Sequence, residues 1–193
     1  VIDSGLSRVP RFDVSSGLTR LATVKVSRSS AEQRRGRAGR VEPGVCYRLW
    51  DEEQTRGLVP HQAPEMLEAD LTGLALDLAR WGARSAEGLA LLDPPPAGAF
   101  AEARAVLTRL GALDGEGALT AHGRRIAALP LSPRLAHMVA VASDRDEALT
   151  GARIAAVLGE PGLGGRDPDL RERLTGLERD RTPRARDALK LAD

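Results

Sequence analysis

The stretch SSAEQRRGRAGR, residues 29–40, is the most informative part of this sequence. Ser30 stands three positions before Gln33, which is the capping-box spacing typical of a helix start, and the preceding serine repeats the pattern one position earlier. At 100° per residue, a helix that begins here brings Gln33, Arg37 and Arg40 onto one narrow face. We therefore predict a helix from about Ser30 that presents one amide and two guanidinium groups together.

Two glycines and the lack of an acidic residue distinguish this predicted face. A glycine inside a helix costs about 1 kcal/mol relative to alanine, so Gly36 and Gly39 are poor choices unless another surface must approach closely. Two arginines without an acidic neighbour indicate an anionic partner, and guanidinium groups can stabilise the charge that builds on transferring γ-phosphate oxygens. A solvent-exposed, arginine-rich helix that touches nucleic-acid phosphates is the alternative, and the spacing leaves both interpretations open.

The basic residues are concentrated in the first quarter of the chain. The 193 residues have a formal net charge of only +1, which argues against a uniformly basic, histone-like binder. Residues 1–50, however, carry ten Lys and Arg against four Asp and Glu, whereas residues 51–193 carry 18 against 23. Arginine, which suits bidentate phosphate contacts, supplies all but two of the basic side chains. The N-terminal part is therefore the predicted site of an anionic partner.

Several classes of protein are excluded by composition. The single cysteine, Cys46, allows no internal disulfide and fits a reducing compartment, so we expect a cytoplasmic protein. The three histidines, His61, His122 and His137, lack the spacing of metal ligands, and we predict no metal site. No apolar run approaches the roughly 18 residues of a membrane span. The first residue is Val1 within an apolar run, so we expect the chain to be part of a longer protein.

The order of predicted elements changes at about residue 50. Before it, strands are predicted over 1–3, 11–14 and 18–26, with a hairpin loop at Ser15–Gly17, followed by the helix and a strand over 45–49. After it, the pattern is helical, and 42% hydrophobic residues are enough for packed cores. We therefore predict a mixed α/β N-terminal part followed by a mostly α-helical part.

The helical part begins with the pattern of a winged helix. Apolar residues recur at helical spacing over 67–81 and over 100–110. A turn at Asp114-Gly115 then separates two short apolar pairs, which predicts a small hairpin, and Thr120 is the predicted cap of a helix that runs to Leu129. Further helices are predicted over 134–143, 145–158, 169–179 and 184–192.

The aromatic and histidine side chains favour structural roles. Trp50 and Trp81 are able to stack on nucleic-acid bases, but Trp81 ends an apolar stripe and Trp50 ends a strand, so core packing is the favoured interpretation for both. His122 and His137 lie beside apolar residues in predicted helices and are interpreted as structural.

Residues 33–40, QRRGRAGR, resemble motif VI (QRxGRxGR) of the DEAH-box helicases of superfamily 2. The resemblance extends almost continuously over residues 1–158, and details at 48–50 and 131–137 are most similar to the bacterial HrpB type. Segments that match the family are found at 1–6, just after motif V, and at 12–13, 17–18, 43–49, 64–65, 92–96, 110–114, 119–124 and 129–133.

The resemblance implies a role for each matched position. Gln33 would position the γ-phosphate and the attacking water, and Arg37 and Arg40 would act as arginine fingers from the second RecA-like lobe. Arg34 would couple the ATP state to the nucleic-acid side, and Arg35 stands at the variable position of the motif and receives no role.

The hairpin that follows motif V lies against the nucleic-acid strand in this family. Arg8, Arg11 and Arg20 are therefore candidate phosphate contacts, although an ordinary solvent-exposed hairpin face explains each of them as well. The resemblance also divides the chain into the end of RecA-like lobe 2 (1–50), a winged helix (51–119) and the start of a helical ratchet domain (120–193).

The phosphate-binding loop and the DEAH box of the family are absent from these 193 residues, and the glycine-rich segment 159–165 lacks the Lys-Ser/Thr of a phosphate loop. The resemblance thus implies half of an ATPase site, inactive alone, whose Mg²⁺ ligands lie outside this chain. The parent protein would use ATP and Mg²⁺ to move 3′ to 5′ on single-stranded RNA or DNA, with RecA-like lobe 1 as partner of this part. A non-catalytic winged-helix or protein-interaction module is the alternative, and the acidic balance of residues 51–193 argues against its binding a duplex.

Overall fold

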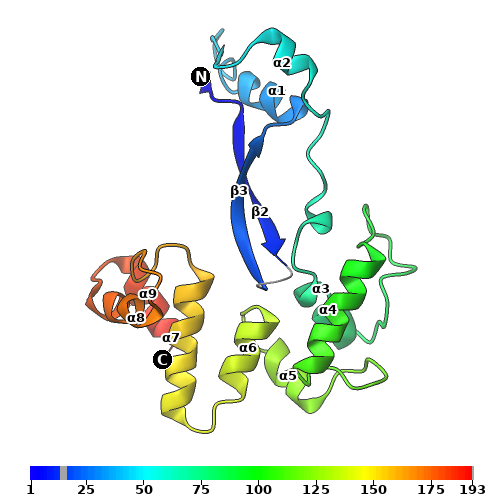
Figure 1. Cartoon of the computed structure of the whole chain (residues 1–193), viewed down its shortest axis with the longest axis vertical. Coiled ribbons are helices and arrows are strands. Elements are labelled where there is room, and N and C mark those ends of the chain that lie inside the picture. The colour runs from blue at the N-terminus through cyan, green and yellow to red at the C-terminus, as the bar shows by residue number, and fades with distance from the viewer. Residues whose placement is uncertain (14–16, 193) are drawn as a thin grey trace. The chain divides into compact units, whose positions relative to one another are not determined.

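The structure, a computed structural model, describes residues 1–13 and 17–192 and separates into two units (Figure 1). The first unit consists of Val1–Asp70 and Ala90–Pro96, and the second of Leu71–Leu89 and Ala97–Asp193. The first unit is mixed α/β and the second is helical, which confirms the predicted fold class. The predicted domain boundaries at residues 50 and 119 stay a prediction. Ser15 and Ser16 of the predicted hairpin loop lie outside the described residues.

A short parallel sheet and one helix form the centre of the first unit. Strand β1 (Ile2–Asp3) pairs with β4 (Tyr47–Arg48), and helix α1 (Arg28–Gly36) buries Ala31 completely. The predicted helix start at Ser30 is wrong, because the N-cap is Ser27, whose extended backbone places its hydroxyl 3.2 Å from the Ser30 amide. Helix α2 (Glu52–Arg56) and the 3-10 helix η1 (Glu65–Leu67) complete the unit.

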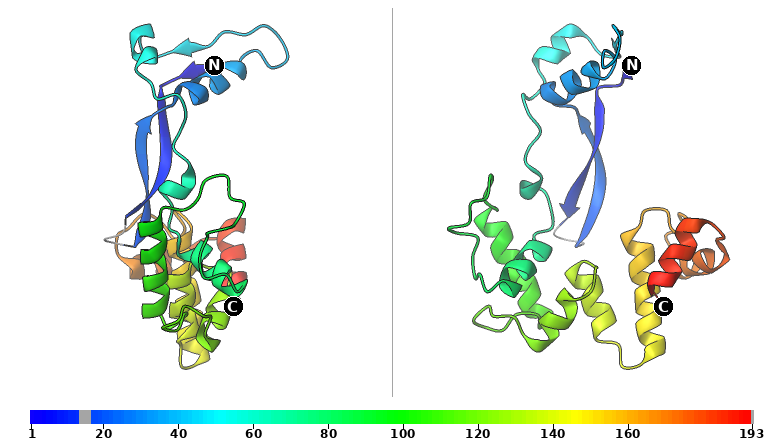
Figure 2. Two further views of the ribbon diagram at one scale, coloured as in Figure 1. Left: turned by 90° about the vertical axis from the view of Figure 1, so that its right-hand side faces the viewer. Right: turned by 180° about the vertical axis from the view of Figure 1, so that it is seen from behind.

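The hairpin of the first unit is longer than the sequence pattern predicted. Strands β2 (Leu6–Asp13) and β3 (Leu18–Lys25) pair antiparallel and form a twisted two-stranded ribbon (Figure 2). The Val26 amide bonds to the Gly5 carbonyl at 2.9 Å, and since hydrogen-bonded pairs alternate, Pro10 falls at a position that needs no amide hydrogen. This explains why β2 begins at Leu6 and runs through Pro10 rather than starting after it.

Three helices and a short hairpin form the first part of the second unit. Helices α3 (Thr72–Arg80), α4 (Ala97–Arg109) and α5 (Ala121–Ala127) surround buried Leu107 and Ile126. The hairpin is reduced to a single antiparallel bridge between Leu113 and Leu119. The predicted turn at Asp114-Gly115 is found within residues 114–117, where the Gly117 amide bonds to the Asp114 carbonyl at 3.0 Å. The Asp114 carboxylate accepts from two later amides, and Gly117 is the residue with positive φ.

The predicted cap of α5 is confirmed. The Thr120 hydroxyl accepts from the Gly123 amide at 2.9 Å and donates to the Gly111 carbonyl at 2.6 Å. Helix α5 ends at Ala127, two residues before the predicted end. The cap therefore ties the start of α5 to the hairpin that precedes it.

Four further helices complete the second unit, and the last three of them contribute to a separate hydrophobic cluster. They are α6 (Pro133–Ala140), α7 (Arg145–Gly159), α8 (Leu170–Arg179) and α9 (Pro183–Ala192), and their bounds agree with the predicted ranges to within three residues. No helix in the described ranges is long and apolar enough to cross a bilayer. The buried residues of the cluster are Val157, Leu163, Leu177, Ala185 and Ala188.

The two histidines of the second unit contact each other. His122 Nε2 lies 2.9 Å from His137 Nδ1, and Arg125 Nη2 lies 3.1 Å from His122 Nδ1. Because a guanidinium only donates, Nδ1 of His122 accepts, and its ring is neutral with the proton on Nε2. Burial, and then the charges of His137 and Arg125, lower the pKa of His122 in agreement with this arrangement.

The prediction that Trp81 packs in the core is wrong. Helix α3 starts at Thr72 and stops at Arg80, so the apolar spacing of residues 67–81 runs beyond the helix at both ends. Gly82, with a φ of 86°, ends α3, and Trp81 at the C-cap is 80% exposed. Trp50, in contrast, is half-buried, and its indole donates to the Thr55 hydroxyl at 3.0 Å.

Candidate functional site

Gln33 and Arg37 border one open hollow in the first unit, which we call the α1 hollow. Its volume is about 460 Å³, and it is lined by Val1, Ile2, Asp3, Ser4, Ser30, Gln33, Arg34 and Arg37. Gln33 and Arg37 are exposed and lie one helical turn apart. Among residues 1–13 and 17–192, no ion pair or side-chain hydrogen bond holds either of them. An amide and a guanidinium are therefore both free to bind an anion in the α1 hollow.

Arg40 does not share this helical face. The amides of Arg37 and Ala38 bond to carbonyls three residues earlier, which tightens the last turn and ends α1 at Gly36. The chain then turns back, and Gly44 approaches the Ala38 carbonyl so closely that a Cβ there would collide with it. Arg40 is exposed in this turning segment and does not line the α1 hollow, so the predicted three-residue face is wrong for this residue.

The two glycines of the motif have open surroundings. A Cβ at Gly36 would meet nothing within 4 Å, and one at Gly39 would meet only the Glu42 carbonyl oxygen at 3.9 Å. Within the described part of the chain, nothing approaches these glycines closely. The prediction that another surface approaches Gly36 and Gly39 closely thus stays a prediction, and it concerns a surface that is not part of the described residues.

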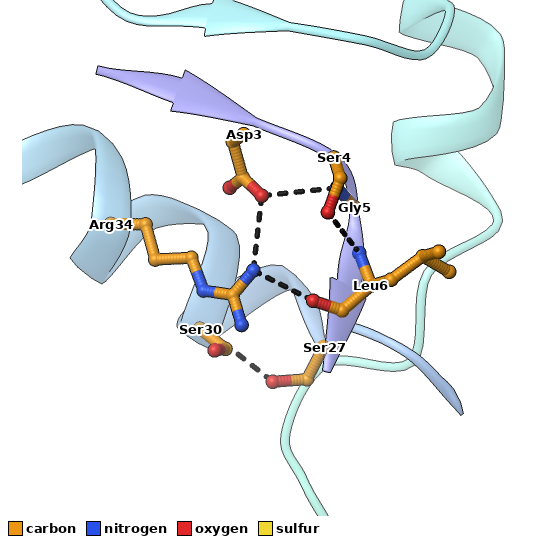
Figure 3. A network of polar contacts seen from close by, with 7 residues as sticks. All are labelled: Asp3, Ser4, Gly5, Leu6, Ser27, Ser30 and Arg34. Carbon is orange, nitrogen blue, oxygen red and sulfur yellow. Dashed lines mark hydrogen bonds and ion pairs between the residues drawn. The ribbon is translucent and has the colours of Figure 1, made fainter. Parts of the chain in front are cut away.

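Arg34 leaves α1 in a different direction and reaches the start of the hairpin (Figure 3). Its Nη1 atom donates to Asp3 Oδ1 and to the Leu6 carbonyl, each at 3.0 Å. The Asp3 side chain is 1% exposed, and the same Oδ1 accepts from the Gly5 amide at 3.0 Å. The Asp3 carboxylate and the Arg34 guanidinium together thus connect α1, the end of β1 and the first residue of β2.

A second acidic residue fixes the opposite side of α1. Glu32 accepts a hydrogen bond from Arg48 of β4 at 2.6 Å and forms an ion pair with Arg35 at 2.8 Å. The hydrogen bond from Arg48 is the main reason why the pKa of Glu32 lies below its ordinary value; burial opposes this shift, and the positive charges of Arg35 and Arg48 add to it. Arg48 also lies 5.5 Å from the centre of the Trp50 ring. The sequence alone pointed to no role for Glu32. For Asp3 there was a signal, because an acidic residue directly after apolar Val1 and Ile2 in a predicted strand is buried only where it has a partner.

The three candidate arginines of the hairpin do not lie on one face. Arg11 stands directly opposite Arg20, whereas Arg8 stands opposite Thr23, and since side chains alternate along a strand, Arg8 points to the other face. Arg11 has a partner inside the first unit, because its Nη2 lies 3.4 Å from Glu68 Oε1. The structure thus places Arg11 and Arg20 together and separates Arg8 from them.

Acidic, cysteine and histidine side chains are the possible protein ligands of a divalent cation. In the described part of the chain, no group of three or more His, Cys, Asp or Glu side chains is placed to hold a metal ion. The prediction that the Mg²⁺ ligands lie outside these residues stays a prediction.

The sequence and the structure of this chain are similar to those of known helicases. Residues 103–131 match the family described as helicase associated domain (HA2), winged-helix. The chain is 46% identical over 161 residues to the ATP-dependent RNA helicase HrpB of Escherichia coli, which is 83% of this chain and 20% of that protein. It is 34% identical over 167 residues, 86% of this chain and 14% of the relative, to the pre-mRNA-splicing factor ATP-dependent RNA helicase prp22 of Schizosaccharomyces pombe.

Solved structures agree with the sequence relatives. The crystal structure of the E. coli DExH-box NTPase HrpB matches with a TM-score of 0.76 at 41% identity and covers 100% of this chain and 24% of its own. That of the E. coli DEAH/RHA helicase HrpB matches with a TM-score of 0.77 at 41% identity and covers 94% of this chain and 25% of its own. The chain spans about one fifth or less of the length of the curated relatives it matches. It is a homologue of the HrpB-type DEAH-box helicases that matches one part of such a protein, and its residues 103–131 match the HA2 winged helix.

Proposed function

We propose that this chain is the part of an ATP-dependent helicase that completes the ATPase site from the second RecA-like lobe. The observation that carries the proposal is the α1 hollow, where Gln33 and Arg37 stand open and unpaired among the described residues. The relatives, named as ATP-dependent RNA helicases, supply the class of reaction. The first lobe of the same protein is the proposed partner that holds ATP and Mg²⁺.

The proposed chemistry is electrostatic. The guanidinium of Arg37 would stabilise the negative charge that develops on the γ-phosphate oxygens, and the amide of Gln33, one turn earlier, would orient the phosphate and the attacking water. Arg40 would act as a second finger from the turn after α1, where its exposed position lets it reach a nucleotide held by a neighbouring lobe. Alone, the chain is expected to hydrolyse no ATP, because the phosphate-binding loop and the DEAH box, which would hold ATP and Mg²⁺, are absent from these 193 residues.

Arg34 is the proposed coupling residue. Its bonds to Asp3 and Leu6 join the helix of the α1 hollow to the first residues of the hairpin, so a movement of α1 would be transmitted to β2.

Arg8, Arg11 and Arg20 of the hairpin are the proposed contacts to the phosphates of single-stranded RNA or DNA, along which the parent protein would move 3′ to 5′. The single cysteine agrees with a reducing compartment, and we propose the cytoplasm.

A chimera tests the proposal. This chain would replace the matching segment of E. coli HrpB, and ATP hydrolysis would be measured with and without single-stranded RNA. Arg37→Ala is expected to lower turnover by about 10³–10⁵-fold, and Arg40→Ala by a similar factor. Arg35→Ala is the matched control, because Arg35 lies on the same helix but is paired with Glu32, and it should change turnover less than about threefold. A loss of only a few-fold for Arg37→Ala would contradict the arginine-finger role.

A further inference from the structure

An exposed tryptophan and two arginines border a second open hollow, which lies in the second unit and which we call the Trp81 hollow. Its volume is about 490 Å³, and its walls come from the end of α3, Leu119 of the short hairpin before α5, and α5 itself. Trp81 is 80% exposed, which is unusual for the largest apolar side chain. The lining residues are Ala79, Arg80, Trp81, Gly82, Leu119, Arg124, Ala127 and Ala128.

The end of α3 holds Trp81 at a fixed place. The amide of Ala83 bonds to the Leu78 carbonyl at 2.8 Å and that of Gly82 to the Ala79 carbonyl at 3.1 Å, which is the paired bonding of a Schellman motif. The Trp81 amide itself bonds to the Asp77 carbonyl at 3.0 Å. The exposure of the indole is thus built into the helix end, and it does not come from a frayed segment.

The charge of the Trp81 hollow is positive. Arg80 and Arg124 line it, and none of its lining residues is acidic. Arg124 Nη1 lies 3.3 Å from the Leu119 carbonyl, which keeps its guanidinium beside the hairpin strand, while across the described ranges no ion pair engages Arg80 or Arg124. The hollow therefore combines one open aromatic face with two unneutralised cations.

We propose that the Trp81 hollow binds one nucleotide of a single-stranded nucleic acid. A base would stack on the indole of Trp81, and the adjoining phosphates would contact Arg80 and Arg124, which is how single strands are bound without sequence preference. The inference rests on the proposed function, since a helicase supplies the strand. It adds a subsite on the winged helix to the hairpin contacts proposed above.

The composition of the hollow favours a nucleotide over a protein partner. A protein interface needs a wide apolar core around its aromatic anchor, whereas the other apolar residues here are Leu119 and three alanines. Small side chains next to a flat ring leave space for a base, and the volume is within the range of sites for single small ligands. Arg80 and Arg124, which have no acidic partner among the described residues, match the charge of the phosphates on either side of a nucleotide.

The whole 193-residue chain can be tested with a fluorescein-labelled poly(U) 12-mer. Anisotropy titrations at low salt should show that Trp81→Ala weakens binding by about 5- to 100-fold, because one stacked base is lost. Trp81→Phe, which keeps an aromatic face, should stay within about threefold of the unchanged chain. Arg124→Ala should weaken binding and reduce the slope of log Kd against log salt by about 0.7. Arg171→Ala is the matched control, because it removes an exposed arginine of α8 outside the hollow and should have little effect.

Intrinsic fluorescence gives a second readout. Unlabelled oligonucleotide should quench the unchanged chain strongly and the Trp81→Phe variant weakly, since the remaining Trp50 is half-buried in the first unit. If Trp81→Ala binds the oligonucleotide as tightly as the unchanged chain does and the fluorescence of Trp81 is not quenched, the proposal is overturned. The Trp81 hollow would then be a contact site for another protein surface. That result would not affect the proposed function, because the ATPase chimera and the hairpin variants Arg8→Ala and Arg20→Ala test it independently.

Discussion

The Asp3–Arg34 pair allows a quantitative prediction about stability. In Arg34→Ala, the Asp3 carboxylate, whose side chain is 1% exposed in the folded chain, loses its cation, and the Gly5 amide remains as a hydrogen-bond donor to its Oδ1. Removal of one partner of a fully buried ion pair costs about 3–5 kcal/mol. Arg34 is 31% exposed, so water already screens part of the interaction, and we expect a loss of about 2–3 kcal/mol from the free energy of unfolding.

Trp50 provides the assay, because its ring packs against Gly5, next to the pair. A Cβ added at Gly5 would lie 2.9 Å from Trp50 Cε3, so the indole fluorescence reports on the unfolding of the first unit. Urea titrations followed by this signal would compare Arg34→Ala with Arg35→Ala, whose surface pair with Glu32 should contribute less than about 1 kcal/mol. The Trp81→Phe background removes the second indole from the signal.

A double variant distinguishes a buried charge from general damage to α1. Asp3→Asn in the Arg34→Ala background removes the uncompensated charge, and it should recover about 1 kcal/mol or more of the lost stability. If Arg34→Ala unfolds at the same urea concentration as Arg35→Ala, the buried-pair argument is refuted. Equal stabilities of the single Arg34→Ala and the double variant would likewise show that the charge of Asp3 has no part in the loss.

Two further predictions concern the second unit. The pKa of His122 is lowered in the fold, so as the pH falls the unfolded chain binds a proton near pH 6.5, before the folded chain does. The stability that the His122–His137 contact contributes is therefore complete above pH 6.5 and is lost as the pH falls. The Tm of the second unit should accordingly drop between pH 7.5 and 5.5. His122→Gln should flatten this pH dependence, and an unchanged slope would argue against the neutral ring derived from Arg125. Thr120→Ala leaves the Gly123 amide without its cap and should cost about 1 kcal/mol in urea titrations, whereas Thr120→Ser, which keeps the hydroxyl, should cost much less.

Local patterns predicted most of the helices and the caps that depend on neighbours in sequence. Thr120 caps α5 as expected, and α7, α8 and α9 begin within a residue of their predicted starts, because capping and helical periodicity act over one or two turns. The start of α1 was missed because several serines compete for the cap. Ser27 is the N-cap because buried Val26, which is bonded to the Gly5 carbonyl, brings the chain into the helix in an extended conformation.

Trp81 shows the limit of periodicity. Its spacing continues the apolar stripe of α3, but a glycine with positive φ stops the helix one residue earlier and turns the indole into solvent. An apolar residue is buried by what packs against it in three dimensions, and spacing predicts this only while the helix continues.

The motif in residues 33–40 was enough to predict which chemical groups the site contains, since an amide and guanidinium groups follow directly from Gln33, Arg34 and Arg37. Which of these groups is free was decided by contacts between distant parts of the chain. Arg34 and Arg37 have the same side chain and lie three residues apart, yet Arg34 is bound by a buried carboxylate 31 residues away in the sequence, while Arg37 borders an open hollow. A side chain's partners depend on where the backbone brings other polar groups, and only the folded chain provides that information.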